Sequence, residues 1–338
     1  MADSDKSLNR RWGQVVSWFV LSRMKEHFGW FFSLFRRRPK ILLIADVPDW
    51  IFARHCRMLE RFLGTEYCFT TAYQHQVYRE KDYDLIYPLE FNLVEPEQVR
   101  TPAKYVTGIR SHLTWVRKDF IEIVKLLRTR FQRVHTVSRR LQRVFAPQVP
   151  GVVRVTHGVD TEFFVASTQA DQSGSRLRLG WAGNRLNSSK GFEEFVLPLE
   201  QLPGVELIFC GYQDRNLDVH QMRAFYDSLD AYVCTSDLEG NNNALMEAAA
   251  MQRAIITTDN GTVPEYLRHG ESAIIVERAP DRFREAVLQL RDNPQLRVAL
   301  GRKARPAVAA AFEWEKRAQD YRTFFRSALR NKATWRPS

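Results

Sequence analysis

The chain has 338 residues, 44% of them hydrophobic and 26% charged, with a formal net charge of +11 at pH 7. This is the composition of a soluble globular protein long enough for two packed domains. Nine Lys or Arg and only three acids lie in residues 1–40, so the rest of the chain is only mildly basic. Because the excess charge is confined there and no recognition motif occurs elsewhere in the chain, we expect no nucleic-acid partner.

The four cysteines lie far apart and form no Cys-x-x-Cys motif, and no histidine pair has metal-ligand spacing. We therefore expect no metal site and four small core residues in a reducing cytosol. No apolar run approaches the roughly 20 residues that span a bilayer, and the first residues do not have the pattern of a signal peptide. The expected location is cytoplasmic. The cysteines are Cys56, Cys68, Cys210 and Cys234.

Residues 1–38 are basic and aromatic and are predicted to be helical up to Pro39. Their apolar stripe changes side near residue 20, so we expect a kink or two short helices. Trp and Phe on one side, with Arg or Lys at the ends, suit the plane of an anionic membrane interface. The hypothesis is that residues 8–38 hold the protein peripherally on the inner face of the cell membrane. The alternative is a helix packed on the protein's own surface, because aromatic side chains also fill cores.

Short apolar runs then alternate with amphipathic segments. Strands are expected near residues 40–46, 83–89, 103–109, 133–138 and 152–158, with helices near 52–63, 120–131 and 139–145. Residues 165–176 are polar and form the expected linker, after which strands recur near 177–183, 204–211, 230–236, 254–259 and 272–276. Such alternation predicts parallel sheets with right-handed crossovers. The expected fold is α/β, with two tandem Rossmann-like doubly wound domains at 39–165 and 166–312 and a terminal helix in 313–338.

The segment "WAGNRLNSSKGFEEF" follows the strand at 177–182 and carries Arg185 and Lys190. In open α/β sheets, ligands bind beyond the carboxyl ends of the strands. Backbone amides, a helix N-terminus and two cations together favour phosphate there. The glycine and lysine spacing is not that of a Walker A loop. The alternative is an ordinary polar loop.

The segment "DLEGNNNALMEAAAM" leads from another strand into a predicted helix. Glu239 precedes the helix and Glu247 lies one turn inside it, so the helix N-terminus favours an anion while the two carboxylates suit sugar hydroxyls. The alternative is capping by asparagine, with Glu247 solvated. A third loop, "TTDNGTVPEY", repeats the arrangement with Glu265 at the start of a helix.

Taken together, these elements resemble the large retaining glycosyltransferase family with the GT-B fold, often called family 4 or group 1. The resemblance rests on "EGNNNALMEAAA", "GNRLNSSKG", "NGTVPEYL", "HGVDTEFF" at 157–164 and "FEW" before the last helix. It covers residues 150–330. It implies an enzyme that transfers a sugar, of the hexosyl type, from a nucleotide sugar such as a UDP-sugar or GDP-sugar to a hydroxyl with retention, with no metal and no other cofactor.

The resemblance also implies roles for single residues. Lys190 would bind the donor diphosphate, Glu247 the ribose and Glu239 the transferred sugar. Catalytic candidates are therefore Glu239, Lys190 and, by its position after a first-domain strand, His112. The implied donor-binding residues are Asn184, Arg185, Lys190, Gly191, Tyr212, Gln213, Glu239, Gly240, Asn242, Asn243, Ala244, Leu245, Glu247 and Glu265.

Two features depart from the family pattern. Asn184 occupies the position where many members have an arginine, so either Arg185 makes the second phosphate contact or Lys190 and amides act alone. The usual glycine-rich turn after the first strand is replaced by "ADVPDWIFARH". His55 and His75 also lie in this half, and a lone histidine is more often structural than catalytic.

The expected partners are a nucleotide-sugar donor and a lipid-linked or cell-surface glycan acceptor. "DYD" at 82–84 mimics a metal-binding motif of another glycosyltransferase fold, but it leads directly into a predicted strand. The alternative function is a catalytically inactive sugar-nucleotide-binding or membrane-adaptor protein of the same fold.

Overall fold

The computed structural model describes residues 37–112, 119–167, 176–211 and 216–331. The chain divides into two compact units, residues 1–39 and 40–338, and the elements below belong to the second. The predicted amphipathic helix in residues 8–38 lies, apart from its last two residues, outside the described residues.

The first sheet of this unit is parallel and consists of two three-stranded halves, with the orders β2-β1-β3 and β4-β5-β6. A single bridge between Ile86 and Tyr105 joins its two three-stranded halves. Three helices of the same part of the chain flank it. The elements are β1 (Lys40–Ala45), α2 (Ile51–Leu63), β2 (Cys68–Tyr73), β3 (Leu85–Pro88), β4 (Val106–Ile109), α4 (Phe120–Arg130), β5 (Arg133–Thr136), α5 (Arg139–Phe145) and β6 (Val153–Arg154), with short 3₁₀ turns at Glu80–Asp82, Phe91–Leu93, Pro96–Gln98 and Pro102–Lys104.

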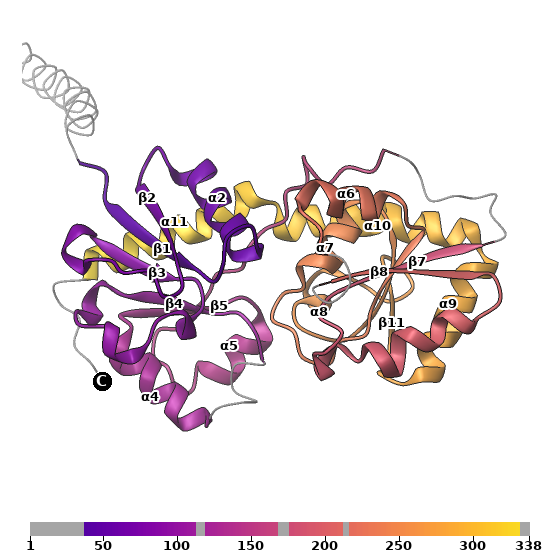
Figure 1. Cartoon of the computed structure of the whole chain (residues 1–338), viewed down its shortest axis with the longest axis horizontal. Coiled ribbons are helices and arrows are strands. Elements are labelled where there is room, and N and C mark those ends of the chain that lie inside the picture. The colour runs from indigo at the N-terminus through magenta and orange to yellow at the C-terminus, as the bar shows by residue number, and fades with distance from the viewer. Residues whose placement is uncertain (1–36, 113–118, 168–175, 212–215, 332–338) are drawn as a thin grey trace, which may run out of the picture. The chain divides into compact units, whose positions relative to one another are not determined.

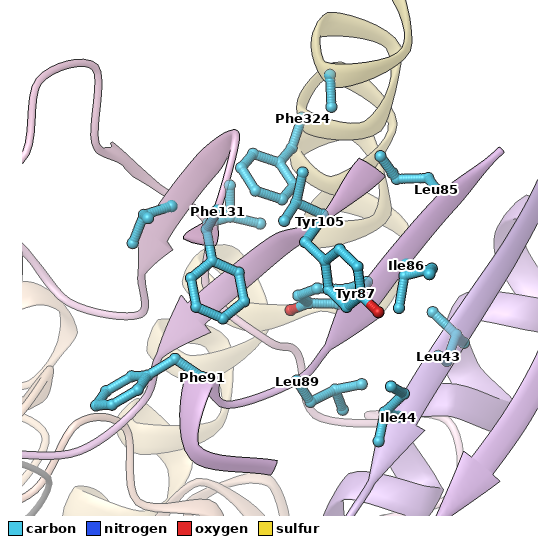
Figure 2. Close-up of a cluster of buried hydrophobic side chains, with 14 of the residues drawn as sticks. Leu43, Ile44, Leu85, Ile86, Tyr87, Leu89, Phe91, Tyr105, Phe131 and Phe324 are labelled. Carbon is cyan, nitrogen blue, oxygen red and sulfur yellow. The ribbon is translucent and has the colours of Figure 1, made fainter. Parts of the chain in front are cut away.

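The core of this sheet includes a helix from the far end of the sequence. Helix α11 (Trp314–Asn331) packs against α2 and β3 and is drawn in yellow in Figure 1. Its Phe324 packs with Tyr87 of the sheet, and both belong to the same buried cluster (Figure 2). We call residues 40–155 together with 314–331 the first lobe. Helix α11 therefore completes the core of the first lobe.

The second sheet is also parallel, with the order β11-β10-β9-β7-β8. Alternate residues of β9 belong to different cores, Tyr232 to one face and Val233 to the other, so the strand is buried on both sides. We call residues 159–312 the second lobe. Its elements are β7 (Leu177–Ala182), β8 (Val205–Cys210), α6 (Val219–Asp227), β9 (Ala231–Cys234), α7 (Asn243–Ala250), β10 (Ala254–Thr258), α8 (Val263–Tyr266), β11 (Ile274–Val276), α9 (Pro280–Asp292) and α10 (Pro294–Phe312).

The chain passes between the lobes twice, and the two crossings lie side by side. Val159 bridges Glu313, and the Val159 amide donates to the Phe312 carbonyl at 2.7 Å. A Cβ on Gly158 would lie 2.7 Å from that same carbonyl oxygen, so the close approach requires glycine. Val155 packs in the core of the first lobe and Val159 in a core of the second. The chain therefore enters the second lobe before residues 165–176, the polar segment predicted as the linker.

The structure corrects two local expectations. Cys68 is exposed at the start of the edge strand β2, whereas the other three cysteines are buried as expected. The helix predicted after Lys190 is a π-helix, Phe192–Val196, followed by a 3₁₀ helix, Leu197–Gln201. Pro198 carries no amide hydrogen and so cannot continue an α-helical ladder at this point.

Candidate donor-binding site

A cavity of about 310 Å³ lies at the carboxyl ends of β7, β8 and β9, lined mostly by the second lobe. Two larger hollows, of about 410 and 500 Å³, lie on the first lobe, and none of the predicted site residues lines either. Half of the predicted donor-binding residues meet at the 310 Å³ cavity. They are Asn184, Lys190, Glu239, Asn242, Asn243, Ala244 and Glu247.

Lys190 and Glu239 form an ion pair at this cavity, Nζ to Oε1. Lys190 ends a 3₁₀ turn, Ser188–Lys190, and Gly191 after it has φ +59°, in the left-handed region that favours glycine. The Thr235 hydroxyl donates to the Lys190 carbonyl and thereby ties this loop to the loop after β9. Burial opposes the charge on Lys190, but the neighbouring Glu239 leaves the pKa of the ammonium above its ordinary value. Lys190 therefore remains cationic at neutral pH.

Glu247 is 4% exposed and has partners for both oxygens. Arg54 of α2 in the first lobe places Nη2 2.6 Å from Oε1, and the Tyr226 hydroxyl donates to Oε2 at 2.9 Å. Burial and the adjacent carboxylate raise the pKa of Tyr226 well above its usual value, so the hydroxyl stays a donor. The solvated Glu247 of the alternative interpretation is wrong, because helix α7 faces the core.

The three consecutive asparagines have different roles. Asn241 is buried; its amide nitrogen donates to the Thr156 hydroxyl at 3.0 Å, and its oxygen accepts from Thr262. Asn242 caps α7, because its Oδ1 accepts from the Leu245 amide at 3.1 Å. Its Nδ2 also lies 3.1 Å from Glu239 Oε1. Asn242 thus both caps α7 and lines the cavity.

Asn243 is oriented by a stack of buried side chains, Arg110 and His55 of the first lobe and His157 of the crossing between the lobes. The guanidinium of Arg110 only donates, and its Nη1 lies 3.3 Å from Nδ1 of both His55 and His157. Each Nδ1 therefore accepts, which leaves the proton of His55 on Nε2, 3.2 Å from Asn243 Oδ1. The nitrogen end of the Asn243 amide is then the donor available to a ligand in the cavity.

His112 contacts the carboxylate-bearing turn without lining the cavity. Its Nδ1 lies 2.7 Å from the Glu239 carbonyl oxygen and must carry the proton, because a carbonyl only accepts. Burial lowers the pKa of the imidazole. The ring is therefore neutral at neutral pH.

Several predicted residues lie elsewhere. Glu265 accepts from the Arg139 amide at 2.7 Å and pairs with Arg154, so its carboxylate contacts the N-terminus of α5 and does not line the 310 Å³ cavity. The Leu245 side chain is in the core and its amide is used by the cap. Gly240 packs against the Arg110 carbonyl. Arg185 and Gly191 do not line the cavity, and Tyr212 and Gln213 lie outside the described residues.

Sequence reasoning missed Arg54 and Tyr226, which both line the cavity and both hold Glu247. Arg54 belongs to the stretch "ADVPDWIFARH", whose departure from the family pattern was the only available signal. Tyr226 lies in a helix that carries no recognisable sequence motif.

Within the described ranges, no three His, Cys, Asp or Glu side chains cluster as a metal site, and no helix among them is long and apolar enough to cross a membrane.

Residues 146–293 match the family described as "Glycosyl transferases group 1". The chain is 25% identical over 215 residues to the GDP-mannose-dependent monoacylated alpha-(1-6)-phosphatidylinositol monomannoside mannosyltransferase of Corynebacterium glutamicum, a match over 52% of this chain and 56% of that protein. It is 28% identical over 246 residues to the lipopolysaccharide core biosynthesis mannosyltransferase LpcC of Rhizobium leguminosarum bv. viciae, over 59% and 69% of the two chains. The match thus spans little more than half the length of the corynebacterial relative.

Among solved structures, Anabaena Alr3699/HepE in complex with UDP and glucose superposes with a TM-score of 0.66. The match covers 86% of this chain and 100% of that one, at 14% sequence identity. At this identity the likeness concerns the fold alone. Both described lobes accordingly have the GT-B arrangement of two Rossmann-like domains.

Proposed function

We propose that this chain, whose residues 146–293 match the group 1 glycosyltransferase family, transfers a sugar from a nucleoside-diphosphate donor to an acceptor hydroxyl with retention at the anomeric carbon. The observation that carries the proposal is the convergence of Lys190, Glu239 and Glu247 on one cavity at the carboxyl ends of the second sheet. That edge is where open α/β sheets bind ligands.

The proposed chemistry needs charge stabilisation more than proton transfer. Negative charge builds on the diphosphate as the bond to the sugar breaks, and the Lys190 ammonium lies at the cavity where it can stabilise that charge. Asn243 and Ala244 begin α7, whose positive dipole end adds to the same effect. Glu239 accepts hydrogen bonds from sugar hydroxyls and Glu247 from the ribose. No step in this scheme requires a metal ion.

We propose a lipid-linked or cell-surface glycan as the acceptor. The corynebacterial relative is named for a phosphatidylinositol mannoside acceptor and the rhizobial one for lipopolysaccharide core biosynthesis.

We also propose that the enzyme is cytoplasmic and that residues 8–38 bind anionic lipid of the inner membrane face. Sedimentation with anionic liposomes tests this part: the full chain should pellet and a chain starting at residue 39 should not. Equal binding by both would contradict it.

Donor screening tests the central proposal. Thermal unfolding is followed with UDP, GDP, ADP and their sugars, because a ligand that binds only the folded state raises the melting temperature. One base is expected to stabilise the protein most. Transfer from the corresponding sugar donor is then followed by NMR, which should show retained anomeric configuration in the product.

The same screen separates the two functions that the sequence allows. Binding followed by turnover supports the enzyme. Tight donor binding with no turnover on any lipid-linked or glycan acceptor would instead support the inactive nucleotide-sugar binder. Absence of any nucleotide-dependent stabilisation would reject both.

A further inference from the structure

Arg54 connects the first lobe to the proposed donor site. It lies in α2, and its side chain lines the 310 Å³ cavity beside residues of the second lobe. Its guanidinium lies between the Glu247 carboxylate, at 2.6 Å, and the Phe164 ring, whose centroid is 5.7 Å from Cζ. The side chain is 22% exposed, so it is held in place but still reaches the cavity.

Among the described residues that line the cavity, two are cations, and each is paired with one of two carboxylates of the site. Lys190 pairs with Glu239, and Arg54 pairs with Glu247. In the proposed function, sugar and ribose hydroxyls occupy these same carboxylates, while the diphosphate brings at least two negative charges into the same space. A donor whose hydroxyls hydrogen-bond to both carboxylates therefore frees Lys190 and Arg54 to pair with its phosphates.

We propose that Arg54 is the second phosphate-binding cation of the donor site, and that it exchanges Glu247 for the diphosphate when the donor binds. This inference rests on the proposed function. It accounts for Asn184 in place of the family's arginine, because the cation comes from the opposite lobe. Arg185, the other candidate, does not line the cavity. An arginine fork also matches phosphate geometry better than a point charge does.

One consequence is that the donor site is complete only when the lobes are together. The replacement of the glycine-rich turn by "ADVPDWIFARH" also acquires a role, since this stretch begins α2 and carries Arg54. A rival role is that Arg54 merely blocks Glu247 in the ligand-free protein. The two roles predict opposite changes in donor affinity when Arg54 is replaced. Affinity rises if Arg54 only blocks Glu247, and it falls if Arg54 binds the diphosphate.

The test is calorimetric titration of the full chain with UDP, GDP and the corresponding nucleosides. Arg54→Gln should weaken binding of the preferred diphosphate by about tenfold or more, the effect of losing one charge-assisted hydrogen bond. Binding of the nucleoside should stay equal or improve, because Glu247 is released. Arg54→Lys should recover part of the diphosphate affinity.

Arg61→Gln is the matched control. Arg61 lies on the same helix and also pairs across the lobes, with Asp160 at 3.2 Å and Glu162 at 2.8 Å, but it does not line the cavity. It should retain the wild-type affinity. Equal weakening by Arg61→Gln would assign the effect to lobe spacing and overturn the inference. Unchanged or tighter diphosphate binding by Arg54→Gln would overturn it too, while the proposed function stands. A wild-type protein that binds no nucleotide would overturn the proposed function itself.

Discussion

The Nδ1 atom of His112 lies 2.7 Å from the backbone carbonyl oxygen of Glu239, so a first-lobe imidazole is fixed against the turn that carries a second-lobe carboxylate. The contact spans 127 positions in sequence. This hydrogen bond fixes both the tautomer of the His112 ring and the position of the turn that carries Glu239. His112 thus has a positioning role that does not depend on how substrate contacts the ring.

His112→Ala should lower kcat by about tenfold, because the Glu239 turn loses a hydrogen bond that fixes it. His112→Gln retains an N–H donor and should recover part of the rate. Burial lowers the pKa of the ring, so its protonation occurs at a lower pH than usual. The pH profile of kcat should therefore be flat from pH 8 to about pH 6.5 in the wild type. A decline that begins above pH 7 would contradict this account.

Lys190→Ala and Glu239→Gln should each reduce kcat/KM by about 100-fold or more, because each removes a group that contacts the departing or transferred part of the donor. Circular dichroism should show that both variants are folded. Arg282→Gln is the control, since it breaks an exposed ion pair with Glu285 on α9, away from the cavity. Near-normal turnover by either site variant would reject its assigned role.

Gly240→Ala should separate the lobes. The added Cβ would lie 1.6 Å from the Arg110 carbonyl oxygen of the opposite lobe, and backbone cannot move aside as a side chain can. We expect weaker donor binding and faster proteolysis between the lobes. Gly151→Ala is the control, because its strained φ of +73° is accompanied by open space. If Gly151→Ala were equally damaging, backbone strain rather than lobe contact would be the cause.

Acid should destabilise the fold through three buried histidines. Burial first, and the positive charge of Arg110 in addition, lower the pKa of His55, His135 and His157 well below 6.5. Their folded-state pKa values lie below those of the unfolded chain, so the unfolded state binds protons first as the pH falls. Stability is thus complete above about pH 6.5 and falls below it, by about 1.4 kcal/mol per histidine and pH unit.

Urea unfolding between pH 7.5 and 5 measures this slope. His135→Gln should make it shallower, whereas His220→Gln, a change on the exposed face of α6, is the control for losing an imidazole. An identical slope in the wild type and His135→Gln would contradict the prediction.

The alternating apolar runs were enough to predict both sheets and nearly every strand. They failed at β2, an edge strand in which half of the residues are exposed and two are threonines, so that it forms no apolar run. Lys190, Glu239 and Glu247 could be predicted because they share a local motif. Arg54 could not, because its contact with Glu247 joins positions 193 residues apart and depends on how the lobes pack. The contacts of Glu265 could not be predicted for the same reason, because its partners, Arg139 and Arg154, belong to the other lobe.

Helix α11 has a consequence for synthesis. The core around β1 and β3 is completed by three residues of α11, Trp314, Tyr321 and Phe325. The first lobe is synthesised first, but its core cannot be completed until α11, which follows the second lobe in the sequence, has been synthesised. The second lobe, with all of its strands between β7 and β11, has its sheet available earlier. A nascent chain stalled before residue 314 would expose an apolar surface on the first lobe, and chaperones would meet that surface on every copy during translation.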